Sequence, residues 1–239
     1  MMRRVLLAGN FLQGDCWLAH WLLPDDGHEN VVVCCPRNAE IYEVMRREVL
    51  GVRIDHIDVR GPVEDGDCQG ELRLYRAWLN RYAPQECADG AITMEAMGIA
   101  CIPMRPFPAL RRPRQPAGDL VTHQLWSAHP GKEWPAILDA CAGLNSVTLW
   151  QGQGAVLGRA EHVGWAGVWT WLAQSSLHVG INSSVTILAY CMRVPTILCS
   201  YIAQPNWAEW DTTHGHFLER PSVETIRAAI AHVRRDLVC

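Results

Sequence analysis

The chain has 239 residues, of which 49% are hydrophobic and 19% charged, and a formal net charge of -4. This composition is that of a globular protein that can bury a sizeable core, and it excludes a disordered or fibrous chain. The small negative charge argues against a dedicated nucleic-acid binder, which usually carries a net basic face. The function must therefore be sought in local patterns.

Cysteines and apolar runs bear on the compartment. The ten cysteines are scattered without a CxxC pair, which favours buried, reduced thiols over a disulfide framework or a zinc site. The basic and apolar start, 1–9, is too short for a signal peptide. The longest later apolar stretch, 185–202, is interrupted by Arg193 and Pro195, so it does not suit a membrane span. We therefore expect a cytoplasmic protein with no membrane span.

Strands and helices alternate in the first half of the chain. The predicted elements are, in order, a strand at 5–8, a helix opening near Asp15, a strand at 31–35, a helix at 39–50, a strand at 52–57, a loop at 61–70 and a helix at 72–82. Such alternation predicts a parallel sheet that is covered by helices.

Five prolines and four arginines stand between residues 103 and 116, a composition that excludes a regular helix or a central strand. We place a domain boundary there, with one domain at 1–116 and the other at 117–239. In the second domain we predict strands at 125–128, 147–150, 177–180 and 195–200 and helices at 134–142, 168–174, 184–191 and 223–237. The sequence thus predicts two Rossmann-like α/β domains that face each other across a cleft.

Ligands of open parallel sheets bind in the loops that follow the strands. The first such loop holds Gly14 and Asp15, where the carboxylate is either functional or a helix cap. The loop after the first strand of the second domain holds His129, Gly131 and Lys132. A glycine and a lysine before a helix suit a phosphate, because free N–H groups, the helix dipole and the ammonium favour the same charge.

Two further loops of the second domain are candidates. Gln151 and Gly152 belong to a Gln-Gly-Gln-Gly loop, whose glycines would let a nucleotide lie against the backbone. The last loop supplies small polar side chains at the start of a helix, which suit an anion or a ribose: Asn182, Ser183, Ser184 and Thr186.

Histidines give weaker signals. Asp211, His214 and His216 invite a metal site, but they lie on a predicted loop and lack a further ligand at familiar spacing, so we favour a solvated loop. His178 lies within a predicted strand, where we expect a core histidine with satisfied hydrogen bonds rather than a catalyst.

Three of these places resemble the ADP-heptose:lipopolysaccharide heptosyltransferases, which are two-domain GT-B glycosyltransferases. Gly14-Asp15 is similar to the Gly-Asp pair of that family's first loop, Lys132-Glu133-Trp134-Pro135 matches its Lys-x-Trp-Pro element, and Asn182-Ser183-Ser184 is similar to its Asp-Ser/Thr-Gly loop. Asn182 replaces the family's aspartate, and Ile187 stands where the family has a histidine. An amide recognises other hydroxyls or oxygens than a carboxylate does, so the sugar need not be heptose.

The resemblance, which covers residues 120–239 and the opening loop of the first domain, implies metal-independent transfer of a sugar from a nucleotide-diphosphate sugar to an acceptor hydroxyl. Asp15 would be the catalytic base, and Lys132 would stabilise the departing diphosphate. The donor would contact Gly14, His129, Gly131, Gln151, Gly152, Asn182, Ser183, Ser184, Thr186 and Trp207, whose ring would stack on a base or sugar.

The resemblance implies no cofactor besides the donor substrate. It leaves the acceptor open among a glycan, a small molecule and a modified nucleic acid. Two alternatives to a transferase remain: a non-catalytic nucleotide- or sugar-binding module of the same fold, and a nucleotide-sugar epimerase.

Overall fold

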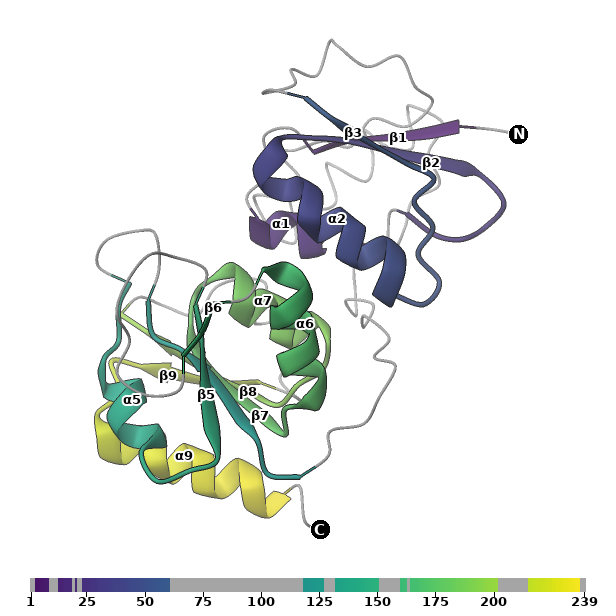
Figure 1. Ribbon diagram of the computed structural model, residues 1–239. Coiled ribbons are helices and arrows are strands. Elements are labelled where there is room, and N and C mark those ends of the chain that lie inside the picture. Colours follow the sequence, from purple (N-terminus) through teal and green to yellow (C-terminus); the bar gives the residue numbers. More distant parts are fainter. Residues whose placement is uncertain are drawn as a thin grey trace, which may run out of the picture. The chain divides into compact units, whose positions relative to one another are not determined.

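The computed structural model describes residues 3–8, 13–18, 20, 23–60, 118–126, 132–150, 160–162, 164–201 and 215–236 (Figure 1). The chain divides into two compact units, Met1–Arg111 and Arg112–Cys239, and each is described by itself. The predicted loop at 61–70 and helix at 72–82 lie outside the described residues. The predicted boundary after residue 116 and the cleft between domains stay predictions.

The first unit contains a three-stranded parallel sheet in the order β1-β2-β3. The strands are β1 (Arg3–Ala8), β2 (Glu29–Cys34) and β3 (His56–Val59). Its helices, α1 (Gln13–Leu18) and α2 (Pro36–Glu48), pack against each other on one side of the sheet (Figure 1). The strand predicted at 52–57 forms at 56–59 instead, and Val52 makes an isolated antiparallel bridge to Pro24.

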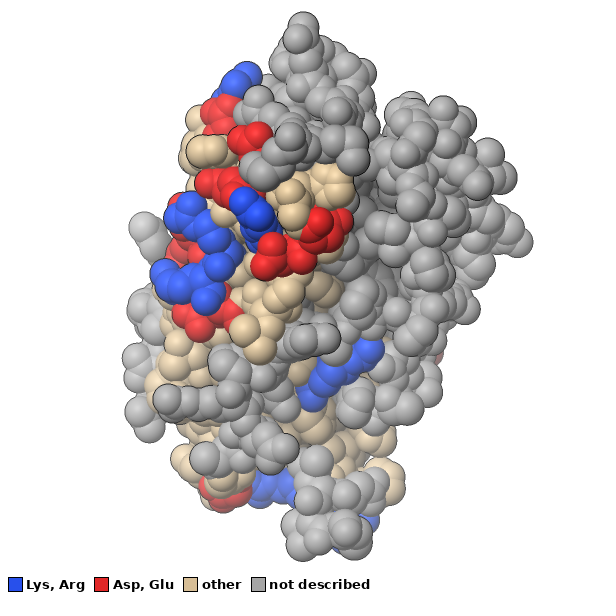
Figure 2. Space-filling model, turned by 90° about the vertical axis from the view of Figure 1, so that its right-hand side faces the viewer, with Lys and Arg blue, Asp and Glu red and all other residues tan. Residues whose placement is uncertain are grey.

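Helix α2 shows why these residues form this element. Pro36 stands at its first turn, where the fixed φ of proline suits a helix and no N–H is needed. Ile41, Tyr42, Val44 and Met45 are buried on one side of the helix. Its outer side carries charges of both signs, which form ion pairs such as Arg46 to Glu43. Basic and acidic side chains therefore alternate over the described surface of this unit (blue and red in Figure 2).

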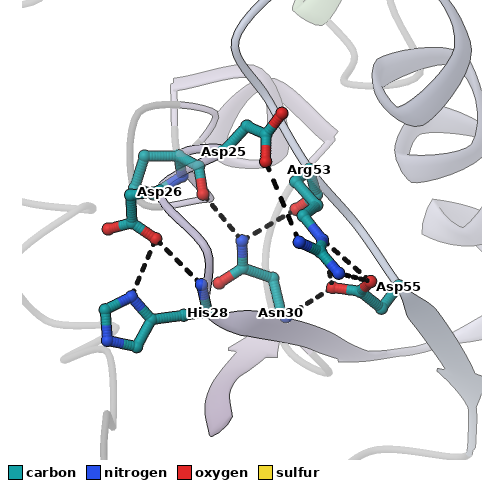
Figure 3. A network of polar contacts seen from close by, with 7 residues as sticks. Asp25, Asp26, His28, Asn30, Arg53 and Asp55 are labelled. Atoms are coloured by element: carbon teal, nitrogen blue, oxygen red, sulfur yellow. Dashed lines mark hydrogen bonds and ion pairs between the residues drawn. The ribbon is translucent and has the colours of Figure 1, made fainter. Parts of the chain in front are cut away.

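A polar cluster fixes the amino end of the first sheet (Figure 3). Asn30 is fully buried, and its side-chain amide donates to the carbonyls of Pro24 and Arg53, at 2.9 Å each. Its backbone N–H donates to Asp55 at 2.9 Å. The Arg53 guanidinium also donates to Asp55, and this hydrogen bond lowers the pKa of the Asp55 carboxyl. The cluster thus joins the chain before β2 to the chain before β3.

The second unit contains six parallel strands in the order β6-β5-β4-β7-β8-β9. They are β4 (Val121–Gln124), β5 (Ser146–Trp150), β6 (Ala160–His162), β7 (Leu177–Ile181), β8 (Thr196–Ser200) and β9 (Gly215–Glu219). The chain builds outward from β4 to β6, returns to the centre and builds outward again from β7 to β9. This is the doubly wound order of Rossmann folds, and its switch point lies between β4 and β7.

Helices cover both faces of this sheet (Figure 1). On one face lie α5 (Ala136–Cys141) and α9 (Val223–Asp236), on the other α6 (Trp165–Gln174) and α7 (Ser184–Cys191). Helix α9 buries Ile226, Ile230 and Val233, whose spacing places them on one side of a helix. They pack with apolar residues of β4, β7 and β8 into a hydrophobic core between α9 and the sheet.

Some sequence predictions for this unit are wrong. The strand predicted at 125–128 lies at 121–124, where three of the four residues are polar and all are buried. Strands β6 and β9 were not predicted, and His216, which was assigned to a loop, lies in β9. Among the described residues six cysteines are free and buried, in agreement with the expected buried thiols. No helix in the described part of the chain has the length and apolarity that a membrane crossing requires.

Candidate functional site

The switch point between β4 and β7 is the place where the fold itself favours a ligand. Gln124, the last residue of β4, pairs with Gly180 of β7. The chain leaves β4 toward α5 on one face of the sheet and leaves β7 toward α7 on the other (Figure 1). Such diverging loops open a crevice at the carboxyl ends of the strands, where doubly wound proteins bind their ligands.

Lys132 lies between β4 and α5, close to an anchored tryptophan. The backbone N–H of Trp134 donates to the Leu125 carbonyl at 2.9 Å, and its indole N–H donates to the Pro221 carbonyl at 3.1 Å. The Trp134 ring also packs on Tyr201, with ring centroids 4.0 Å apart. Lys132 is half-buried, and within the described residues its ammonium forms no hydrogen bond or ion pair. An unpaired cation at this end of β4 is suited to an anionic ligand.

The predicted ligand contacts that follow β7 are of two kinds: some of their side chains are hydrogen-bonded within the protein and others are not. Ser183 caps α7, since its hydroxyl accepts the N–H of Thr186 at 3.3 Å, and it also donates to the Gln124 side chain. Thr186 is fully buried, and its hydroxyl lies 3.3 Å from that of Ser183. Asn182 and Ser184 are half-buried, and their side chains have no hydrogen-bond partner in the described structure. Asn182 and Ser184 are therefore the side chains of this loop that are free for a ligand.

Behind this loop lies His178, which the structure places in β7 with no exposed surface. Its Nε2 lies 3.2 Å from the Thr186 hydroxyl and its Nδ1 lies 3.2 Å from the Thr122 hydroxyl. Burial, together with a smaller effect of the nearby His123, lowers the pKa of His178 to about 3. The imidazole is thus neutral at pH 7 and bonded at both nitrogens, which confirms the prediction of a satisfied core histidine.

His123 lies on the opposite face of the same sheet and is 2% exposed. Its Nε2 lies 2.7 Å from the Thr148 hydroxyl, whereas its Nδ1 has no hydrogen-bond partner in the described structure. Burial lowers its pKa to about 4. This histidine is therefore also neutral at pH 7, and it carries an unsatisfied buried atom.

Other predicted site residues fall in the first unit or outside the description. Gly14 and Asp15 lie within α1, which begins at Gln13. Asp15 thus lies in the first turn of the helix, and both of its predicted roles, catalytic base and helix cap, stay predictions. The Asp15 side chain itself is not among the described ones. Five predicted donor contacts also lie outside the described residues: His129, Gly131, Gln151, Gly152 and Trp207.

Metal chemistry finds no support among the described side chains, where no group of three or more His, Cys, Asp or Glu could hold an ion. Asp211 and His214 of the sequence analysis lie outside that part of the chain. Burial raises the pKa of the Cys34, Cys141 and Cys191 thiols to about 12, so these are inert core residues.

Thr122 and Gln124 belong to the site although the sequence pattern did not predict them there. Both precede the apolar residues 125–128, where the sequence predicts the strand. The polar sequence Thr-His-Gln before them is typical of a loop. A signal was present all the same. Strands of a parallel sheet that is covered on both faces are usually near-continuous apolar runs, so polar residues in one of them indicate a specific hydrogen-bond network.

A doubly wound parallel sheet with helices on both faces and polar loops at its switch point defines a Rossmann-like class of α/β protein. No family model and no curated protein sequence matches the chain. The fold class is therefore assigned from the similarity of the chain to solved structures.

The chain is similar to a family 9 glycosyl transferase from Veillonella parvula, with 12% identity over 98% of this chain and 97% of that chain and a TM-score of 0.67. It is also similar to an E. coli heptosyltransferase with ADP, at 11% identity, 99% and 98% coverage and a TM-score of 0.61. A third similar structure is E. coli ADP-heptose lps heptosyltransferase II, with 8% identity, coverage of 99% of this chain and 100% of that chain, and a TM-score of 0.60. The fold is that of GT-B glycosyltransferases, as the resemblance to heptosyltransferases predicted.

Proposed function

We propose that the chain is a glycosyltransferase that moves a sugar from a nucleotide-diphosphate sugar to an acceptor hydroxyl without a metal ion. The observation that carries the proposal lies at the carboxyl ends of two neighbouring strands: within the described residues, Lys132 after β4 and Asn182 and Ser184 after β7 form no side-chain hydrogen bond or ion pair. A cation suits the diphosphate, and two neutral hydrogen-bonding side chains suit hydroxyl groups. The fold neighbours, which are glycosyltransferases, support the same class.

The proposed reaction is a displacement at the anomeric carbon. The bond from that carbon to the diphosphate oxygen breaks, and a bond to the acceptor oxygen forms. Asp15 takes the proton of the acceptor hydroxyl as general base. Lys132 stabilises the negative charge that develops on the departing nucleoside diphosphate.

An adenosine diphosphate sugar is the first donor to test, because two similar E. coli structures contain ADP and ADP-2-deoxy-2-fluoro heptose. The amide of Asn182 in place of a carboxylate leaves the sugar open. A glycan or a small molecule is the proposed acceptor, and a modified nucleic acid is an alternative. We place the reaction in the cytoplasm, where the six buried free thiols would stay reduced.

Binding of ADP is the measurement that tests the donor site. Because a ligand that binds only the folded state stabilises it, ADP should raise the melting temperature of the protein. Lys132→Ala should weaken ADP binding by about 1.5–3 kcal/mol, since it removes a charge-assisted contact with the phosphates. Isothermal titration calorimetry of wild type and variant measures this difference directly.

Arg235→Ala is the matched control. It removes one positive charge from the last turn of α9, which lies at the amino end of the sheet and away from the switch point. ADP binding should be unchanged in this variant. If ADP, UDP, GDP and CDP all leave the melting temperature unaltered, the donor site does not exist. Binding without sugar transfer to any acceptor would instead favour the non-catalytic binding module.

A further inference from the structure

Five buried or half-buried polar side chains connect β4, β7 and the start of α7 into one hydrogen-bond network. It runs from Thr122 through His178 to Thr186, with 3.2 Å between the imidazole nitrogen and the hydroxyl on each side. Thr186 then contacts Ser183, and Ser183 donates to Gln124. The network therefore crosses the switch point, from the middle of β4 through β7 to the loop after β7 and back to the last residue of β4.

Every member of this network is satisfied. A buried polar group without a partner is destabilising, so a network of this size is tolerable only when its geometry is closely fixed. Gly180 supplies the room, since a Cβ atom there would lie 2.3 Å from the Thr186 hydroxyl and 2.6 Å from His178 Nε2. The Thr122 end of the network is also held in place. The Ser175 hydroxyl lies 3.1 Å from the Thr122 hydroxyl and donates to the Trp171 carbonyl at 2.7 Å.

The network determines which side chains of the loop remain free. Ser183 and Thr186 use their hydroxyl groups inside the protein, whereas Asn182 and Ser184, the residues on either side of Ser183, have no partner within the described structure. With Ser183 bonded to both β4 and α7, the backbone of its two neighbours is fixed at the carboxyl end of the sheet. The geometry of the free groups thus depends on buried residues that do not reach the surface.

We propose that His178 is a positioning residue for the nucleotide-binding loop: through Thr186 and Ser183 it holds Asn182 and Ser184 in the orientation that binds the donor. This inference rests on the proposed function. His178 does not touch the donor, and its contribution is the pre-organisation of the loop. Without the network the loop must be ordered on binding, which lowers the affinity for the donor.

Thr186→Val and Thr186→Ser test this inference as a pair. Valine has the shape of threonine without the hydroxyl, so it leaves both His178 and Ser183 without their contact, whereas serine keeps the hydroxyl. Thr186→Val should raise the Kd for ADP roughly tenfold, and Thr186→Ser should restore it to within about twofold of wild type. Calorimetry with ADP is the readout, and near-UV circular dichroism verifies that each variant is folded.

Thr196→Val is the control for a merely structural role. It removes a buried hydroxyl of β8 that donates to the Val194 carbonyl and does not belong to the network, so it should lower the melting temperature without changing the Kd for ADP. Equal weakening of ADP binding in Thr196→Val and Thr186→Val would overturn the positioning role, and so would unchanged binding in Thr186→Val. If Thr186→Val does not fold, Thr122→Val, which removes the hydroxyl on the other side of His178, replaces it against the same control.

The outcome separates the two proposals. If the wild type binds ADP and Thr186→Val binds it equally well, the donor site stands and the positioning role is wrong. If the wild type binds no nucleoside diphosphate, both proposals fall.

Discussion

Gly180 lies where the structure has no room for a larger side chain. Its Cα lies so close to the buried network that any Cβ would collide with Thr186 and His178. Both neighbours are fully buried and hydrogen-bonded, so neither side chain can turn away without leaving a polar atom unsatisfied. The requirement for glycine here comes from packing.

We expect Gly180→Ala to destabilise the second unit by about 1–3 kcal/mol, the usual cost of overpacking a buried site. Urea denaturation followed by tryptophan fluorescence gives the change in the free energy of unfolding. Combining it with Thr186→Ala removes the nearest clashing atom. The double variant should therefore lose less than the sum of the two single losses. Strict additivity would show that the contact does not limit this position.

The sequence predicted some of the candidate ligand contacts, namely Lys132, Asn182 and Ser184. Each is a polar residue that soon follows a strand, and the structure leaves each one unpaired within its described part. Ser183, the N-cap of α7, and Thr186, in the first turn of α7, are equally polar, yet their hydroxyls bond inward. Composition alone could not separate the two groups, because the difference lies in which residues face β4 and β7.

At the scale of elements, helices and apolar strands were predicted well from periodicity. The predicted helix at 184–191 coincides with α7, and the strand at 177–180 lies within β7. Strand β4 was misplaced by four residues because its Thr-His-Gln sequence lacks the apolar pattern of a buried strand. Its polar side chains are tolerated only because partners from β5, β7 and α7 satisfy most of them, and those partners are distant in the sequence.

The polar cluster at the amino end of the first sheet should stabilise the first unit, because it joins the segment before β2 to the segment before β3. Asn30 donates two side-chain hydrogen bonds, to the carbonyls of Pro24 and Arg53 (Figure 3). Asn30→Asp keeps the shape but replaces the donor by an oxygen that faces these two carbonyls. We expect it to destabilise the first unit by more than Asn30→Ala does, with a loss of about 3 kcal/mol or more, because it buries an unpaired charge.

Urea denaturation of the two variants measures this difference. His28→Ala is a suitable control, since His28 contacts only Asp26 among the described residues of the cluster and is partly exposed. It should change the free energy of unfolding by less than about 1 kcal/mol. If Asn30→Asp is as stable as wild type, the two carbonyl contacts do not hold the segments together.

At the scale of the whole molecule, the two units differ in how much of their function can be derived. The strand order of the second unit places a switch point between β4 and β7, and Asn182 and Ser184, which follow β7, have no side-chain partner within the described residues. The sequence predicted alternating strands and helices, but not this order, because order depends on pairing between distant segments. In the first unit the proposed base, Asp15, lies in the first turn of α1, and its role rests on the family resemblance.

The two buried histidines make the stability of the second unit depend on pH. Burial lowers the pKa of His178 to about 3 and that of His123 to about 4, from an ordinary value of 6.5. Below pH 6.5 the unfolded chain therefore binds protons that the folded protein does not. The free energy of unfolding must then fall as the pH drops from about 6.5 toward 4, by up to about 1.4 kcal/mol per pH unit for each histidine. Above pH 6.5 this contribution to stability is complete.

Carboxyl groups with lowered pKa, such as Asp55 and Asp119, act in a different window. They lose their contribution only as the pH falls below about 4, the value of the unfolded chain. Urea denaturation between about pH 5 and 7 thus isolates the histidines, and tryptophan fluorescence follows the unfolding.

The variant His123→Leu with Thr148→Val removes one of the two histidines together with its hydrogen-bond partner. Because His123 already has an unsatisfied nitrogen, the apolar pair should cost little stability at neutral pH. It should roughly halve the dependence on pH, since only His178 then titrates with a strongly lowered pKa. A free energy of unfolding that stays constant over this range in the wild type would mean that both imidazoles are accessible to protons in the folded protein. In that case His178 could not be the closed, neutral link on which the positioning of the loop depends.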